Sequence, residues 1–253
     1  MSASVVATLR AAGCVFAEEE ATLLIEAAHS PAELDRLVAL RVAGQPLEHL
    51  LGWVLFYGAR IGVAPGVFVP RRRTELLARL ASSLCREGSV VVDMCCGSGA
   101  VGAVLAGVEA HAVDVDPAAV ECARSNLPDG SVYLGDLYDA LPSPLRGRID
   151  VLVANAPYVP TASIALMPPE ARVYEPAIAL DGGEDGLDVQ RRILARAPNW
   201  LAPGGHVLIE TSREQAPVLA ECFEAAHLSA DIVEDDDLAA TVVVGTTRAP
   251  SSD

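Results

Sequence analysis

Aromatic residues make up only 4% of this 253-residue chain, and no apolar run approaches the roughly 18 residues of a membrane span, although 51% of the residues are hydrophobic. Basic residues are also scarce: 18 Lys and Arg against 34 Asp and Glu give a formal net charge of −16. This charge opposes partners bound mainly through phosphates, so we expect no direct binding of nucleic acid. The N-terminus lacks a basic start followed by an apolar block, so we expect no signal peptide, no membrane segment and a cytoplasmic protein.

The cysteines show no CxxC spacing and no pairing with the five scattered histidines. This pattern argues against a zinc site and against a disulfide framework, and we predict no bound metal. Most of the thiols are expected to be free and buried. The six are Cys14, Cys85, Cys95, Cys96, Cys122 and Cys222.

Residues 1–50 read as a small helical module. Ser30 and Glu33 have the spacing of a capping box, Pro31 stands at the first helical position, and Gly44 follows the helix that they begin. Residues 51–70 change to aromatic and β-branched residues punctuated by glycines, which predicts a β-hairpin linker.

From residue 71 to 250 strand patterns alternate with helix patterns, which indicates parallel strands in a doubly wound α/β sheet. Two final strands without a helix between them suggest a closing antiparallel hairpin. The predicted helices are 74–85, 99–107, 116–127, 187–202 and 213–226. The predicted strands are 89–95, 109–115, 131–136, 150–156, 204–211, 229–236 and 239–247.

A glycine-rich turn follows the first of these strands, where Gly97, Gly99 and Gly102 match GxGxxG at a strand-to-helix junction. Glycines let a ligand approach the backbone, and the helix start offers unpaired amides. Asp114 ends the next strand, where it could accept hydrogen bonds from ribose hydroxyls. The alternative is a tight turn that only packs helix on strand. We predict a nucleoside cofactor, with NAD and S-adenosylmethionine both open at this point.

Two more carboxylates end strands of the same sheet. Asp93 could meet the ammonium of S-adenosylmethionine, or it could cap loop amides. Asp136 could accept from an adenine amino group, or it could form a simple Gly-Asp turn. Because ligands of open α/β sheets lie across the carboxyl ends of the strands, the alignment of both with Asp114 favours the cofactor interpretation.

The fourth strand ends in Asn155-Ala156-Pro157-Tyr158. The nitrogen of an amide or exocyclic amine is a poor nucleophile, and two acceptors for its N–H bonds would orient it for attack. The Asn155 side-chain oxygen and the Ala156 carbonyl can supply them, Tyr158 offers a flat face, and Pro157 stiffens the loop. The alternative is an Asn-x-Pro turn capped by a surface tyrosine.

This Asn-x-Pro-Tyr run resembles the (Asn/Asp)-Pro-Pro-Tyr motif of methyltransferases that act on planar nitrogens. Over nearly its whole length the chain resembles the HemK/PrmC family of release-factor glutamine methyltransferases. The segments that carry the resemblance are RVAGQPLEHLLGWVLFYGARIGVAPGVFVPRRRTELL, DMCCGSGAVG, AVDVDPAAVECARSNL, LVANAPYVP and EPAIALDGGEDGLDVQRRILARAPNWLAPGGHVLIE.

The resemblance implies a class I methyltransferase-like doubly wound domain (71–250), a linker (51–70) and an N-terminal substrate-recognition module (1–50). It implies S-adenosyl-L-methionine as cofactor, and as partner a peptide-chain release factor or another protein, methylated on a glutamine side chain of a Gly-Gly-Gln loop. The implied catalytic residues are Asn155, Ala156, Pro157 and Tyr158. The implied cofactor residues are Phe68, Pro70, Arg71, Asp93, Gly97, Gly99, Asp114, Asp136, Leu137 and Asn155.

Three departures from the family pattern stand out. Ala156 replaces a proline, Arg72 and Arg73 stand in PRRRTE where the family commonly has Pro-Arg-Pro-Glu-Thr-Glu, and ETSREQA replaces a Glu-hydrophobic-Gly segment. Four alternatives stay open: the same chemistry on another protein or small amide, a DNA adenine methyltransferase, an NAD-dependent oxidoreductase, and a binding protein without catalysis. A DNA enzyme should carry a basic groove, and an oxidoreductase leaves Asn155 to Tyr158 unexplained.

Overall fold

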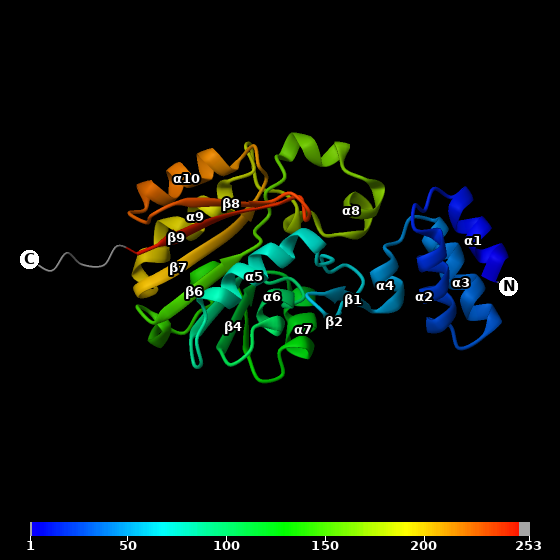
Figure 1. The fold of residues 1–253 in the computed structure, drawn as a ribbon, viewed down its shortest axis with the longest axis horizontal. Helices are drawn as coiled ribbons and strands as arrows, with labels where there is room; N and C mark the ends of the chain where they lie inside the picture. Colours follow the sequence, from blue (N-terminus) through cyan, green and yellow to red (C-terminus); the bar gives the residue numbers. More distant parts are fainter. Residues whose placement is uncertain (1, 248–253) are drawn as a thin grey trace, which may run out of the picture.

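The computed structural model describes residues 2–247, and its centre is a seven-stranded sheet of order β5-β4-β3-β6-β7-β9-β8 (Figure 1). The strands β3, β4, β5, β6 and β7 run parallel. Their bounds are β3 Val90–Met94, β4 Glu109–Asp114, β5 Ser131–Leu134, β6 Ile149–Ala154 and β7 Leu201–Thr211, followed by β8 Asp231–Asp235 and β9 Ala240–Thr246. The predicted doubly wound α/β sheet is confirmed.

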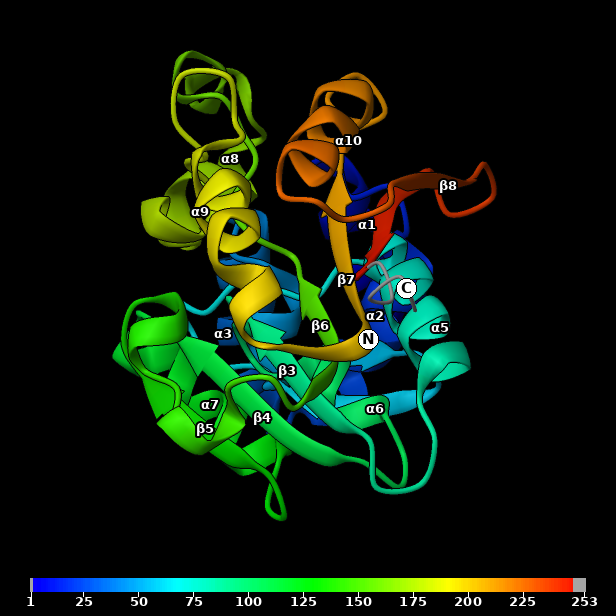
Figure 2. The ribbon, with the colours of Figure 1, turned by 90° about the vertical axis from the view of Figure 1, so that its left-hand side faces the viewer.

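Helices cover both faces of this sheet (Figure 2). Side chains of β3 alternate between two apolar clusters: Val91 packs with α5 and α6, whereas Val92 packs toward α9 and α10. Strands buried on both faces read as continuous apolar runs, which is why SVVVDM carried a strong strand signal. The helix bounds are α5 Glu75–Leu84, α6 Ala100–Val104, α7 Pro117–Asn126, α9 Asp188–Arg196 and α10 Ala216–Ala225.

The sheet ends in the expected antiparallel hairpin. Strand β9 lies between β7 and β8 and runs antiparallel to both. Residues 241–246 of β9 pair with residues 211–206 of β7, so the last strand covers the edge of the longest strand that β6 leaves open.

Four helices precede the sheet: α1 Ser2–Ala11, α2 Ala17–Ala27, α3 Pro31–Val42 and α4 Leu47–Leu51. The Ser30 hydroxyl accepts a hydrogen bond from the Glu33 amide (3.2 Å), so the predicted cap of α3 is confirmed. The helices share an apolar cluster of their own, which includes Leu9, Leu24 and Leu37. They form a bundle at the N-terminal end of the elongated molecule (Figure 1).

A two-stranded hairpin, β1 Trp53–Phe56 and β2 Ala59–Gly62, joins this bundle to the sheet. A second connection runs through helix α8, Pro169–Tyr174. Arg41 of α3 forms ion pairs with Glu20 of α2 (2.6 Å) and with Glu170 of α8, and the Tyr174 hydroxyl donates to the Ala43 carbonyl (3.2 Å). Segments 170–174 and 41–43 therefore meet although they are far apart in sequence.

Several local predictions are wrong. The helix expected over 187–202 ends at Arg196 and continues as a short 3-10 turn, because Leu201 already pairs with Ile149 of β6. The helix after the glycine loop is only five residues long, and α8 was not predicted. All six cysteines are free, but only Cys96 and Cys122 are buried. Within residues 2–247 no helix is long and apolar enough to cross a membrane.

Candidate active site

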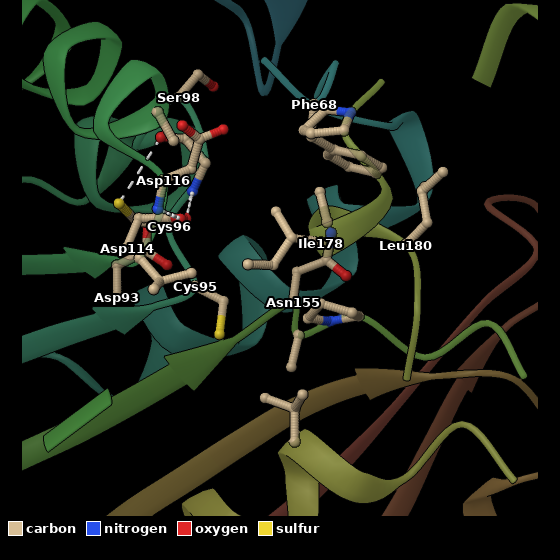
Figure 3. A pocket seen from close by; sticks show the side chains of 18 of the residues that line it. Phe68, Asp93, Cys95, Cys96, Ser98, Asp114, Asp116, Asn155, Ile178 and Leu180 are labelled. Atoms are coloured by element: carbon tan, nitrogen blue, oxygen red, sulfur yellow. Dashed lines mark hydrogen bonds between the residues drawn. The ribbon is translucent and has the colours of Figure 1, made fainter. Parts of the chain in front are cut away.

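A cleft of about 390 Å³ opens at the carboxyl ends of β3, β4, β5 and β6. Figure 3 shows the acidic residues of the glycine-loop side across this cleft from Phe68, Ile178 and Asn155. The predicted site residues that line it are Phe68, Pro70, Arg71, Asp93, Gly97, Asp114, Asp136, Leu137, Asn155, Ala156, Pro157 and Tyr158.

The glycine loop is held by the carboxylate of Asp114. The amide of Gly97 donates to Oδ2 (2.8 Å), and the amide of Asp116 donates to Oδ1 (2.9 Å). Gly97 has a φ of +54° and nothing within 4 Å of the place where a Cβ would stand. The loop backbone is therefore open toward the cleft, and each Asp114 oxygen retains a lone pair for a ribose hydroxyl.

Asp93 is only 3% exposed and accepts a hydrogen bond from the Gly102 amide (3.1 Å). Burial, with the charge of Asp114 adding to it, raises the pKa of Asp93 to about 7 although the amide lowers it. Asp93 fits both predicted roles. It caps the helix that follows the glycine loop, and its carboxyl group borders the cleft, where a bound cation would ionise it.

Gly99 does not line the cleft. It begins α6 with a φ of +75°, and a Cβ there would meet Leu127 at 2.9 Å and Ala123 at 3.1 Å. Gly99 therefore serves the close packing of α6 against α7, which differs from the predicted cofactor contact and from the helix-on-strand packing of the alternative.

Asp136 lies at the cleft but is paired with Arg192 of α9, with 2.5 Å between Oδ2 and the guanidinium nitrogen. Both side chains are about half exposed. Leu137, next to it, is buried with a φ of +49°. An adenine amino group would therefore share Asp136 with an arginine that sequence reasoning missed.

On the linker side, Arg71 lies over the Phe68 ring (5.0 Å to the centroid) and pairs with Glu175 (2.6 Å). The Glu175 carboxylate also accepts from the Val69 amide (3.1 Å). Burial raises the pKa of Glu175, and Arg71 is the strongest influence that lowers it. This pair fixes the linker against the segment before α9.

The Asn155 side chain points its amide nitrogen at the Thr74 hydroxyl, 3.4 Å away. Its oxygen and nitrogen are assigned from this contact. The described residues offer no hydrogen-bond donor to Asn155 Oδ1 or to the Ala156 carbonyl. Two neighbouring acceptors therefore stand free at the end of β6.

The carbonyls that follow are occupied. Pro157 accepts from Gln190 Nε2 (3.1 Å), and Tyr158 accepts from Gln215 Nε2 (2.9 Å). The Val159 carbonyl accepts from the Gly182 amide (2.9 Å). Hydrogen bonds therefore hold the loop on the C-terminal side of Ala156. The Ala156 carbonyl, which is the predicted acceptor, stays available for a substrate.

Tyr158 is largely enclosed, and burial together with the charge of Glu210 raises the pKa of its hydroxyl to about 12. Arg73 lies 5.7 Å from the Tyr158 ring centroid and pairs with Glu210 (3.1 Å). The ring is therefore neutral and presents a flat face beside a cation.

Sequence reasoning missed several residues that shape the site: Thr74, Gln190, Glu210 and Gln215 beside the substrate loop, and Arg192 beside Asp136. Glutamine and threonine are common in turns and helices, so their residue types gave no signal. Within residues 2–247 no three His, Cys, Asp or Glu side chains gather as a metal site.

The cleft fits the predicted S-adenosylmethionine. Carboxylates at three successive strand ends suit its ammonium, ribose and adenine groups. Apolar side chains such as Val115, Ile178 and Phe68 form the facing walls and suit the base and the thioether carbons.

The Methyltransferase small domain model matches residues 59–167. A release factor glutamine methyltransferase of Mycolicibacterium smegmatis is 38% identical over 217 residues, covering 82% of this chain and 76% of the relative. One from Streptomyces coelicolor is 37% identical over 212 residues, covering 80% and 75%.

Two solved structures share the fold. The Mtq2–Trm112 complex of E. cuniculi, which methylates the termination factor eRF1, has a TM-score of 0.54 at 20% identity and covers 72% of this chain and 99% of that one. The 16S rRNA methyltransferase RsmC of T. thermophilus, solved with AdoMet and guanosine, has a TM-score of 0.56 at 23% identity and covers 78% and 50%.

Proposed function

The chain belongs to the family of release factor glutamine methyltransferases, and we propose on that premise that it transfers a methyl group to a glutamine side-chain nitrogen in the Gly-Gly-Gln loop of a peptide-chain release factor. The observation that carries this proposal is the pair of free acceptors at the end of β6, Asn155 Oδ1 and the Ala156 carbonyl. A glutamine side chain has two N–H bonds on one planar nitrogen, and two adjacent acceptors match them.

S-adenosyl-L-methionine is the cofactor, and its sulfonium supplies the electrophilic methyl group. We assign Asp93 to its ammonium, Asp114 to its ribose, and Asp136 with Leu137 to its adenine. The open backbone at Gly97 lets the cofactor approach the glycine loop closely. Phe68, Pro70 and Arg71 cover the cofactor from the linker side. The donor set and the apolar walls of the cleft support these assignments.

The chain's residues act by alignment. Asn155 Oδ1 and the Ala156 carbonyl hold the two N–H groups, so that the nitrogen lone pair points away from them toward the cofactor side of the cleft. The enclosed Tyr158 ring packs against the planar amide, and its high pKa keeps it uncharged. The same two oxygens stabilise the positive charge that the nitrogen acquires before its proton leaves to water.

We further propose that residues 1–50 recognise the substrate protein, that residues 51–70 link this module to the catalytic domain, and that residues 71–250 form the catalytic domain. Residues 248–250 lie outside the described part of the chain. The separate apolar cluster of the bundle supports this division. Release factors act in the cytoplasm, which is where we place the enzyme.

The test incubates the protein with methyl-labelled S-adenosylmethionine and a purified release factor, followed by peptide mass spectrometry. We expect one methyl group on the loop glutamine and none when that glutamine is replaced by asparagine. The variant Asn155→Ala should lose at least about 100-fold in rate, as for loss of a preorganised polar group, and should retain cofactor binding. The matched control is Asn199→Ala, since Asn199 is exposed and lies outside the cleft. Label on another residue of the release factor would contradict the proposal.

A further inference from the structure

Thr74 lies between two side chains on the substrate side of the cleft, Asn155 and Glu210. It ends the short 3-10 turn Arg72–Thr74 before α5, is 3% exposed and lines the cleft. Its hydroxyl oxygen accepts a hydrogen bond from the Asn155 amide nitrogen (3.4 Å). Burial raises the pKa of the nearby Glu210 carboxyl, and a side-chain interaction with Thr74 is the strongest influence that lowers it.

Glu210 is wholly buried near the end of β7. Its Oε1 accepts from Arg73 Nε (3.1 Å), whereas its Oε2 has no partner of good geometry. A buried carboxylate oxygen requires a donor. Arg73 supplies a positive charge on one side, and a rotation of the Thr74 hydroxyl supplies a donor on the other.

We propose that Thr74 is a positioning residue that fixes which way round the Asn155 amide stands, and that the Arg73–Glu210 pair fixes the direction of the Thr74 hydroxyl. The ion pair with Arg73 favours the ionised form of Glu210 against the effect of burial, and an ionised carboxylate only accepts hydrogen bonds, so the Thr74 O–H donates to Glu210. The lone pairs of Thr74 then face Asn155, which must present its NH₂ group. Asn155 Oδ1 is thereby directed toward the substrate.

This inference rests on the proposed function, in which Asn155 Oδ1 accepts an N–H of the substrate amide. If the Asn155 amide were turned by 180°, its NH₂ would face the NH₂ of the substrate, and two donors would meet. The ion pair also gives the departure at Arg73 a role, because Arg73 pairs with the buried Glu210 carboxylate that fixes the direction of the Thr74 hydroxyl.

The test is a cycle of variants measured by methyl transfer to the release factor. Thr74→Val should lower kcat about tenfold, the effect of one hydrogen bond of about 1.4 kcal/mol, with KM changed less than about threefold. Thr74→Ser should retain most of the rate because it keeps the hydroxyl. In the Asn155→Asp background both side-chain oxygens accept, so Thr74→Val should cost less than about threefold. An equal loss in both backgrounds, or a loss that serine does not restore, would overturn the proposal.

A second measurement uses the unsubstituted protein and needs no substrate. In a ¹⁵N-resolved NMR spectrum, the Asn155 NH₂ signals are assigned by their loss in Asn155→Asp. We expect a nuclear Overhauser contact from one of them to the Thr74 methyl group, and its absence would overturn the proposal even if Thr74→Val fails to fold. A protein that shows this contact but methylates no release factor would contradict the proposed substrate while supporting the inferred orientation.

Discussion

The two sides of the cleft are built differently. At the glycine loop on the cofactor side, two carboxylates bind backbone amides of nearby residues: Asp93 holds an amide 9 residues away, and Asp114 one 17 residues away. On the substrate side, Asn155 is held by Thr74 across 81 residues, and Tyr158 by Gln215 across 57. The glycine loop is a local motif, whereas the substrate side is assembled only when the whole sheet has formed.

The sharpest way to break the substrate side alone is Gly186→Ala. Gly186 has a φ of +81°, and a Cβ there would stand 2.3 Å from both Gln215 Nε2 and the Tyr158 carbonyl oxygen. We expect methyl transfer to be lost and the free energy of unfolding to fall by more than about 3 kcal/mol, since strain at positive φ adds to a steric conflict. Denaturant unfolding and the transfer assay measure both.

The matched control is Gly147→Ala. Gly147 also has a positive φ, +71°, but nothing lies within 4 Å of its Cβ position. It should cost about 1 to 2 kcal/mol and leave the transfer rate unchanged. Equal effects of the two substitutions would show that the substrate corner does not depend on this close approach.

The cofactor side is tested through the pKa of Asp93, which burial raises to about 7. Between pH 4 and 7 the unfolded chain releases this proton while the folded chain keeps it. The free energy of unfolding should therefore fall over this range relative to Asp93→Asn, by a total on the order of 4 kcal/mol. Above pH 7 the difference should be constant.

Urea unfolding of both proteins at several pH values measures this difference. In the same range, the affinity for S-adenosylmethionine should rise with pH in the protein and not in Asp93→Asn, because the ammonium selects the ionised carboxyl group. A parallel pH dependence of the two proteins would contradict the role given to Asp93.

A smaller effect on stability distinguishes the two glutamines, Gln215 and Gln190, that hold the substrate loop by hydrogen bonds. Gln215 Nε2 donates to the carbonyls of Tyr158 and Asp185, both at 2.9 Å, while Gln190 donates only to Pro157 and leaves its own buried Oε1 unpaired. Gln215→Met should thus lower the free energy of unfolding by about 1 to 3 kcal/mol, and Gln190→Met by less, because it also removes an unpaired buried oxygen. Thermal melting of both variants tests the order, and the reverse order would refute this explanation.

The smallest expected effect is that of Arg192→Gln. Its ion pair with Asp136 is about half exposed, so the stability should change by less than about 1 kcal/mol. Asp136 would then be free for the cofactor, and the Kd of S-adenosylmethionine should not rise. A control is Arg124→Gln on α7, whose exposed pair with Glu121 lies outside the cleft. A weaker affinity for the cofactor in Arg192→Gln alone would assign the arginine to binding.

The same contrast explains what the sequence could predict. Strand ends, the glycine loop and Asp114 are readable because apolar runs and turn residues lie next to each other in the chain. The early start of β7 was missed because pairing with the distant strand β6 decided it. Gly99 was placed at the cofactor because its motif does not distinguish a backbone that faces the ligand from one that packs on Leu127. Gln190 and Gln215 carry no local signal, whereas Thr74 stands in the PRRRTE run at the threonine of the family pattern.

The most direct test of the central claim is a crystal structure with S-adenosylhomocysteine and a Gly-Gly-Gln peptide of a release factor. The account predicts the glutamine side-chain nitrogen within about 3 Å of both Asn155 Oδ1 and the Ala156 carbonyl oxygen, beside the Tyr158 ring. A complex in which the glutamine lies elsewhere, or in which the Asn155 amide nitrogen faces it, would contradict the claim.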